Sequence, residues 1–197
     1  MKADEAIANW SRPGATDFIH PSRGISEDAY WESGSRQAEL LAQDIPAGVK
    51  VMDFGCGDGR VAIPLRALGY EVTAVDGSAG MVDALAANDP DLTAFQSDGT
   101  DFGSHLGRRK MDAVYCLAVL IHLDYASAEM LIRNLRAIVK KGGLLILDWP
   151  VADEPAEGVA WLDVTTWSEA QQEELAAELG LTRVDDQHVP WQVFRTT

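Results

Sequence analysis

The chain has 197 residues, with 31 acidic and 16 basic side chains that give a formal net charge of −15. A field of this sign repels nucleic-acid phosphates and anionic lipids, so it argues against a duplex-binding or membrane-surface protein. The composition, 47% hydrophobic and 24% charged, is typical of a globular domain. An acidic N-terminal segment, short apolar runs and only two cysteines, Cys56 and Cys116, favour a cytoplasmic protein without a membrane span or disulfide framework.

The first 26 residues lack clear periodicity and combine aromatic side chains with arginines. Two interpretations stay open, a mobile arm and a lid over a binding site. Residues 27–45 predict a helix, because apolar residues recur at helical spacing up to Ile45. We therefore expect residues 1–45 to form an arm and helix that cap the domain, and residues 46–197 to form the ligand-binding domain itself.

Beyond residue 48, apolar runs alternate with helical patterns. Short runs rich in β-branched residues predict buried strands, and the segments between them carry the 3.6-residue period of helices. This alternation is typical of a parallel sheet covered by helices on both faces. The expected strands are residues 49–54, 71–75, 92–95, 111–118 and 144–149, and the expected helices are residues 60–68, 78–87 and 125–140.

The C-terminal part breaks this alternation. Ser168 and Gln171 have the spacing of a capping box, which predicts a helix that begins there and continues to Gly180. Residues 181–189 and 191–195 predict two strands with no helix between them, and strands so close in sequence pair as an antiparallel hairpin. The predicted fold is α/β: a doubly wound, mostly parallel seven-stranded sheet with a C-terminal antiparallel hairpin.

The end of the first expected strand carries the most information about function. The strand has Asp53 near its end, and glycines follow at every second position, at Gly55, Gly57 and Gly59. Glycine lets the backbone turn sharply and approach a ligand closely. In the dinucleotide-binding fingerprint the third glycine comes one residue later, and a carboxylate at this point would repel a pyrophosphate. The pattern therefore favours a ligand that carries an ammonium group.

This DxGxGxG pattern resembles the first motif of the class I S-adenosylmethionine-dependent methyltransferases, which share a Rossmann-like sheet. The resemblance extends over residues 49–197, because four further matches follow in the same order. They are Asp76 after the second strand, Asp98 after the third, the strand with Asp112 near its start that leads to His122, and the glycine-containing turn within residues 139–147. It implies S-adenosylmethionine as the cofactor, S-adenosylhomocysteine as the product and no metal site.

The resemblance also implies where the cofactor binds. Asp76 would accept hydrogen bonds from the ribose hydroxyls, the alternative being that it or Ser78 caps the next helix. Asp98 would face the adenine amine, the alternative being a simple Asp-Gly turn. Tyr30 belongs to a segment that would close over the cofactor's carboxylate, with Arg36 as its counter-charge. The implied cofactor-binding residues are Tyr30, Asp53, Gly55, Cys56, Gly57, Asp76, Gly77, Ser78, Asp98, Gly99 and Leu117.

On the acceptor side, the candidate catalytic residues are His122, His20 and Asp148. A histidine titrates near neutral pH and can take a proton from an acceptor. His122 also recurs in methyltransferases with diverse substrates, which favours a packing role instead. Further candidates for the acceptor pocket are Trp149, Asp153, Trp161 and Trp167.

The predicted function is transfer of a methyl group, by in-line displacement, to an O, N or S atom of a small-molecule acceptor. The sequence contains no [DN]PP[YF] motif and no Pro-Cys pair, which argues against methylation of nucleic-acid amino groups or of cytosine C5. Two alternatives stay open: an NAD-dependent oxidoreductase on a similar sheet, and a non-catalytic protein that binds S-adenosylmethionine and acts through a partner.

Overall fold

The computed structural model describes residues 1–12, 15, 25–185 and 187–197. These residues form a seven-stranded sheet with the strand order β3-β2-β1-β4-β5-β7-β6. The strands are β1 (Lys50–Phe54), β2 (Glu71–Asp76), β3 (Thr93–Gln96), β4 (Met111–Cys116), β5 (Val139–Leu147), β6 (Leu181–Arg183) and β7 (Gln192–Thr196).

The pairing of the strands confirms the predicted α/β fold. Strands β1 to β5 pair only in parallel with one another, whereas β7 lies antiparallel to both β5 and β6. The chain runs outward from β1 to β2 and β3, then returns to place β4 on the other side of β1. In sheets of this kind, ligands bind in the crevice at the carboxyl ends of the strands where the order reverses.

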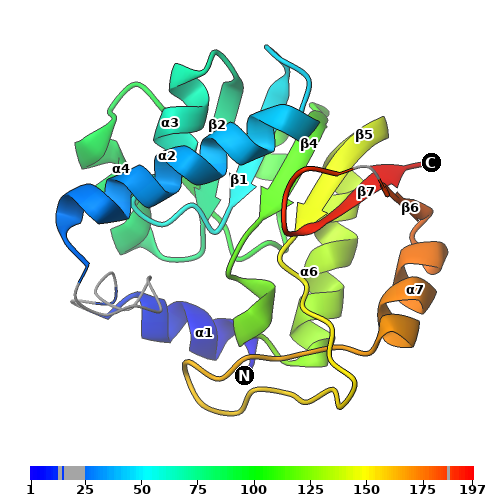
Figure 1. The fold of residues 1–197 in the computed structure, drawn as a ribbon. Coiled ribbons are helices and arrows are strands. Elements are labelled where there is room, and N and C mark those ends of the chain that lie inside the picture. Colours follow the sequence, from blue (N-terminus) through cyan, green and yellow to red (C-terminus); the bar gives the residue numbers. More distant parts are fainter. Residues whose placement is uncertain (13–14, 16–24, 186) are drawn as a thin grey trace.

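Helices cover both faces of the sheet (Figure 1). The helices are α1 (Ala3–Trp10), α2 (Glu27–Asp44), α3 (Ala62–Ala67), α4 (Ala79–Asn88), α5 (Gly103–Leu106), α6 (Tyr125–Ile138) and α7 (Glu169–Glu178), with a short 3-10 helix at Leu120–His122. Side chains alternate along β1, so that Val51 packs in a cluster with α2 and α3, and Met52 packs in a second cluster with α6 and α7.

Helix α1 was not predicted from the sequence. It lies beside the connection formed by residues 150–166 (Figure 1), where the Met1 amino group donates to the Gly158 carbonyl oxygen at 2.8 Å. Its Ile7 side chain contacts Gly77 so closely that a Cβ on this glycine would lie 2.6 Å from Ile7 Cγ1. Helix α1 is therefore held by both the β2 end and the connection after β5.

Several of the predicted boundaries differ from those in the structure. The helix expected at residues 125–140 ends at Ile138, and β5 begins at once at Val139, because Val139 pairs with Met111 of β4. Gly142, which lies between the expected helix and the strand expected from residue 144, is part of β5 and has φ +76°. The strand expected at residues 181–189 is limited to Leu181–Arg183. The capping box at the start of α7 is confirmed.

Helix α2 is part of the hydrophobic core. Its residues Ala38 and Leu41 are fully buried in the cluster that contains β1 and α3. The division into a cap at residues 1–45 and a domain at residues 46–197 stays a prediction. No helix in the described part of the chain combines the length and apolar character needed to cross a bilayer, and the cytoplasmic location also stays a prediction.

Gly34 of α2 gives a test of this packing, because a Cβ at this position would lie 2.0 Å from the Arg60 carbonyl oxygen. Gly34→Ala should lower the free energy of unfolding by about 1–3 kcal/mol, as is typical of overpacking. Urea denaturation measures the change. The matched control is Gly103→Ala, where the nearest atom, Asp101 Oδ1, would lie at 3.4 Å. Equal effects of the two substitutions would contradict the close approach.

Candidate active site

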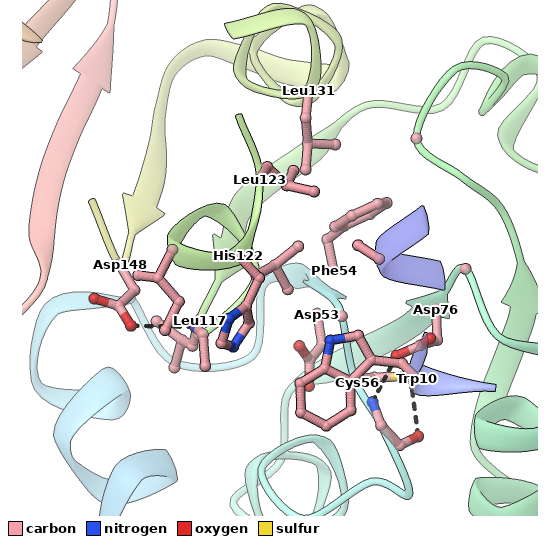
Figure 2. A pocket seen from close by; sticks show the side chains of 18 of the residues that line it. Trp10, Asp53, Phe54, Cys56, Asp76, Leu117, His122, Leu123, Leu131 and Asp148 are labelled. Carbon is pink, nitrogen blue, oxygen red and sulfur yellow. Dashed lines mark hydrogen bonds between the residues drawn. The ribbon is translucent and has the colours of Figure 1, made fainter. Parts of the chain in front are cut away.

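A cavity of about 680 Å³ opens at the carboxyl ends of β1, β2 and β4. Its walls come from the glycine turn after β1, the end of β2, the loops after β3, β4 and β5, and helices α1, α2 and α6. This volume lies within the range of small-molecule and cofactor sites in proteins. Figure 2 shows Asp148 and Leu117 at one side of this pocket and Asp76 at the other, with His122, Asp53 and Trp10 between them.

The glycine turn is fixed to the end of β2 by backbone hydrogen bonds. The N–H groups of Gly55 and Cys56 both donate to the Val75 carbonyl oxygen, at 2.8 and 3.0 Å. The Asp76 carboxylate accepts the Gly57 N–H at 3.0 Å and the Ser78 N–H at 2.8 Å. Gly57 has φ +54°, in the left-handed region that glycine adopts without strain. The turn therefore presents bare backbone toward the cavity.

Asp53 is a buried carboxyl group at the end of β1, with an exposed fraction of 4%. Burial, helped by the nearby charge of Asp76, raises the pKa of Asp53 to about 7. The Tyr115 hydroxyl and the charge of Arg60 act in the opposite direction. A carboxylate in this position is costly to keep ionised unless a cation joins it. Asp53 is therefore suited to bind a positively charged group in the cavity.

Arg60 provides a cation close to the glycine turn. Its guanidinium donates to the Ser33 hydroxyl at 2.9 Å and lies 5.4 Å from the centre of the Tyr30 ring. The Tyr30 hydroxyl donates to Asp58 at 2.7 Å. Arg36, the expected counter-charge, instead pairs with Glu32 at 2.7 Å on the surface. The expectation for Arg36 is wrong, because its helical position turns it away from the cavity that Arg60 lines.

The structure brings the expected cofactor-binding residues together, with one exception. All of them line the cavity except Ser78, which is buried at the start of α4 and whose hydroxyl has no hydrogen-bond partner among the described residues. Asp98 lines the cavity while its carboxylate accepts the backbone N–H and the hydroxyl of Thr100, at 2.9 and 2.6 Å. The turn interpretation of Asp98 is therefore correct and is compatible with a ligand contact.

Two candidate catalytic residues, His122 and Asp148, line the cavity. Burial lowers the pKa of His122, so this imidazole is neutral at pH 7, and its ring lies 5.5 Å from that of Trp10. Asp148 accepts the Ala118 N–H at 3.2 Å, and burial raises the pKa of Asp148. His20, the third candidate, lies outside the described residues.

Comparisons with known proteins place this geometry in a family. The family described as "Methyltransferase domain" matches residues 31–196. The chain belongs to this family. The resemblance to class I S-adenosylmethionine-dependent methyltransferases, and with it S-adenosylmethionine as the cofactor of the family, is confirmed.

The relatives of the chain differ in the acceptors that their names give. The ubiquinone biosynthesis O-methyltransferase of Rickettsia conorii is 30% identical over 113 residues, which cover 55% of this chain and 37% of that protein. The ribosomal RNA small subunit methyltransferase C of Chromohalobacter salexigens is 36% identical over 153 residues, which cover 71% of this chain and 44% of that protein. The chain thus spans about half the length of the curated relatives it matches.

Among solved structures, the magnesium protoporphyrin IX methyltransferase of Synechocystis PCC 6803 with bound S-adenosylmethionine shares the fold. Its TM-score is 0.68 at 20% sequence identity, and the match covers 99% of this chain and 97% of that chain. A likeness at this identity establishes the fold of the methyltransferase and leaves its acceptor open.

Sequence reasoning missed several wall residues of the methyltransferase. Trp10 and Trp191 line the cavity, as do Ile7 and Arg60. Of these, Arg60 directly follows the glycine turn, and its charge at that position is the sequence feature from which its place in the site could have been predicted. The other three come from segments whose position depends on tertiary contacts.

The expected tryptophans have other positions. Trp149 is fully buried in the core, where its ring lies 5.4 Å from that of Trp167. Trp161 lies against Trp10 at 5.5 Å, and Asp153 is exposed and lies outside the lining of the cavity. Within the described ranges, no group of three or more His, Cys, Asp or Glu side chains is placed to hold a metal ion.

The pKa of Asp53 predicts that cofactor binding depends on pH near neutrality. The cofactor amine favours the carboxylate, and below pH 7 this carboxyl group must first lose a proton. The affinity for S-adenosylhomocysteine should therefore fall about tenfold from pH 8 to pH 6. Calorimetry at several pH values measures this change. Asp53→Asn should bind weakly at both pH values, and a steep pH dependence that persists in this variant would contradict the assignment.

Proposed function

We propose that this methyltransferase transfers a methyl group from S-adenosylmethionine to an O, N or S atom of a small-molecule acceptor. The observation that carries the proposal is the continuity of the cavity. Its cofactor half is lined by Asp53, Gly55, Gly57, Asp76 and Asp98. Its acceptor half is lined by Trp10, His122, Asp148 and Trp191.

The residues of the cofactor half fit the groups of S-adenosylmethionine. Asp53 offers a buried carboxylate for the amino group, and Arg60 offers a guanidinium for the carboxylate. Asp76, at the end of β2, has the position and the acceptor atoms for ribose hydroxyls, and Asp98 those for the adenine amine. When bound, the cofactor supplies an activated methyl group on a cationic sulfur.

The chain positions the acceptor, takes a proton from it and keeps water out of the site. Holding an acceptor atom in line with the methyl group can lower the barrier by roughly 7–11 kcal/mol. His122 and Asp148 are the groups on the acceptor side that can take a proton from the acceptor. Helix α1 covers both halves, with Ile7 against Gly77 and Trp10 against His122, and we assign it the role of a lid.

The charges of the cavity favour a small molecule over RNA, although one relative is named a ribosomal RNA methyltransferase. Five aspartates line the described cavity, and Arg60 is the only lysine or arginine among the described lining residues. With a net charge of −15, the protein would repel a phosphate backbone unless a basic partner intervened.

Calorimetry and methyl transfer together test this function. We expect S-adenosylmethionine and S-adenosylhomocysteine to bind and NAD to show no binding, since the acidic turn disfavours a pyrophosphate. With radiolabelled S-adenosylmethionine and a metabolite extract, label should appear in a small molecule. Tight binding of NAD alone would refute the proposal. Cofactor binding without transfer to any extract component would instead support the non-catalytic alternative.

Asp76→Ala tests the ribose contact. The substitution should weaken S-adenosylhomocysteine binding by about 1–3 kcal/mol, which corresponds to roughly 5- to 150-fold in affinity. Part of this loss comes from the Gly57 and Ser78 N–H groups, which lose their acceptor. Asp83→Asn, on the exposed face of α4, is the control for net charge and should bind normally. Unchanged affinity in Asp76→Ala would refute the placement.

A further inference from the structure

The acceptor half of the cavity offers the Asp148 carboxylate as a hydrogen-bond acceptor in an apolar setting. One oxygen of Asp148, Oδ2, accepts the Ala118 N–H, and no described residue donates to the other oxygen. The Nδ1 atom of His122 is buried away from solvent, so it offers no acceptor to a ligand. A ligand that brings an N–H donor would satisfy the free Asp148 oxygen, whereas a ligand that brings only acceptors would not.

The cavity walls around Asp148 include aromatic and aliphatic side chains. Trp10 and Trp191 line the cavity together with Leu162 and Val164, which come from the connection after β5. Aromatic faces attract cations as well as apolar groups. This half therefore suits a molecule with an apolar body and a positively charged end.

No described cation balances Asp148. Arg60, the one lysine or arginine in the described lining, is held at the glycine turn by Ser33 and Tyr30. Burial keeps His122 neutral. An acceptor that carries a carboxylate or a phosphate would enter a field set by Asp148 and the other acids without a counter-charge, which disfavours its binding.

We propose that the acceptor is an organic amine that is cationic at neutral pH and carries no carboxylate or phosphate, and that Asp148 binds its ammonium group. This inference rests on the methyl transfer proposed above and specifies its acceptor. An ammonium group supplies the donor that the free Asp148 oxygen lacks, and its positive charge is opposite to the charge of the aspartates that line the cavity.

In the proposed reaction, Asp148 takes up the proton that the ammonium group must lose, and the cofactor sulfur takes the electron pair of the bond that breaks. The ammonium group gives one proton to the Asp148 carboxylate and becomes a neutral amine. Its lone pair forms the new nitrogen–carbon bond while the carbon–sulfur bond breaks and leaves its electron pair on sulfur. The products are a methylated ammonium ion and neutral S-adenosylhomocysteine, and Asp148 returns its proton to solvent. Burial favours the protonated form of Asp148 and so supports the first step.

The experiment separates acceptors by charge before the reaction. A small-molecule extract is divided by ion exchange at pH 7 into cationic, neutral and anionic pools. Each pool is incubated with the full chain and S-adenosylmethionine that carries a CD3 methyl group, and mass spectrometry detects CD3-labelled products. We expect label in amines of the cationic pool. Label confined to the neutral or anionic pool would overturn the proposal.

Variants at Asp148 identify the residue that selects the amine. Asp148→Asn keeps an acceptor for the Ala118 N–H but removes the charge, and it should lower kcat/KM for the labelled amine by about tenfold or more. Calorimetry should show S-adenosylhomocysteine affinity within about twofold of the original, since the site lies outside the cofactor half. Asp148→Glu should restore part of the activity, and a transfer rate unaffected by Asp148→Asn would overturn the role of this residue.

One control variant and one binding measurement distinguish failure of the amine assignment from failure of the proposed methyl transfer. Asp153→Asn makes the same change of charge at an exposed position on the same connection and should leave transfer unchanged. If S-adenosylhomocysteine binds but no pool gains label, the proposed methyl transfer itself fails, and the amine assignment fails with it. If label enters a neutral hydroxyl compound, methyl transfer stands and only the amine assignment is overturned.

Discussion

The carboxylate of Asp76 joins the two segments on which the site depends. It accepts one N–H from the glycine turn after β1 and one from the start of α4. With the two N–H groups that donate to Val75, this contact fixes the turn to the end of β2. The remaining elements of the site then follow from the parallel sheet, since β4 and β5 end on the same side as β1 and β2.

The site is built at a cost to the stability of the fold. Asp53 is buried beside Asp76, and its neutral form is favoured up to about pH 7. In the free protein, stability is therefore lost as the pH rises from about 4 toward 7, because the unfolded carboxyl group ionises first. A cationic ligand offsets this loss. Buried carboxylates without a resident counter-ion are thus evidence of a binding role rather than of a structural one.

The sequence predicted those parts of the molecule that depend on local pattern. Apolar runs located the strands, and the glycines after Asp53 located the turn, because both depend on residues close in sequence. Helix α1 has only eight residues and is held by contacts of Ile7 and Trp10 with distant segments, so no local pattern could place it. The start of β5 at Val139 depends in the same way on pairing with Met111.

Arg36 and Arg60 show the same distinction within the site. Arg36 lies near Tyr30 in the sequence, and Arg60 directly follows the glycine turn. Only the packing of α2 against α3 decides which of the two guanidinium groups faces the cavity. Gly34 permits that packing by letting α2 approach the Arg60 backbone. The chemistry of each residue could be read from the sequence, whereas its orientation could not.

The position of the site within the sheet has a consequence for local opening of the structure. The two border strands, β3 and β6, have only four and three residues, and such short borders fray first and offer little template for pairing with another chain. The cavity lies at β1 and β4, which each have a neighbour on both sides. Amide protons of β1 and β4 should consequently exchange with solvent later than those of either border strand.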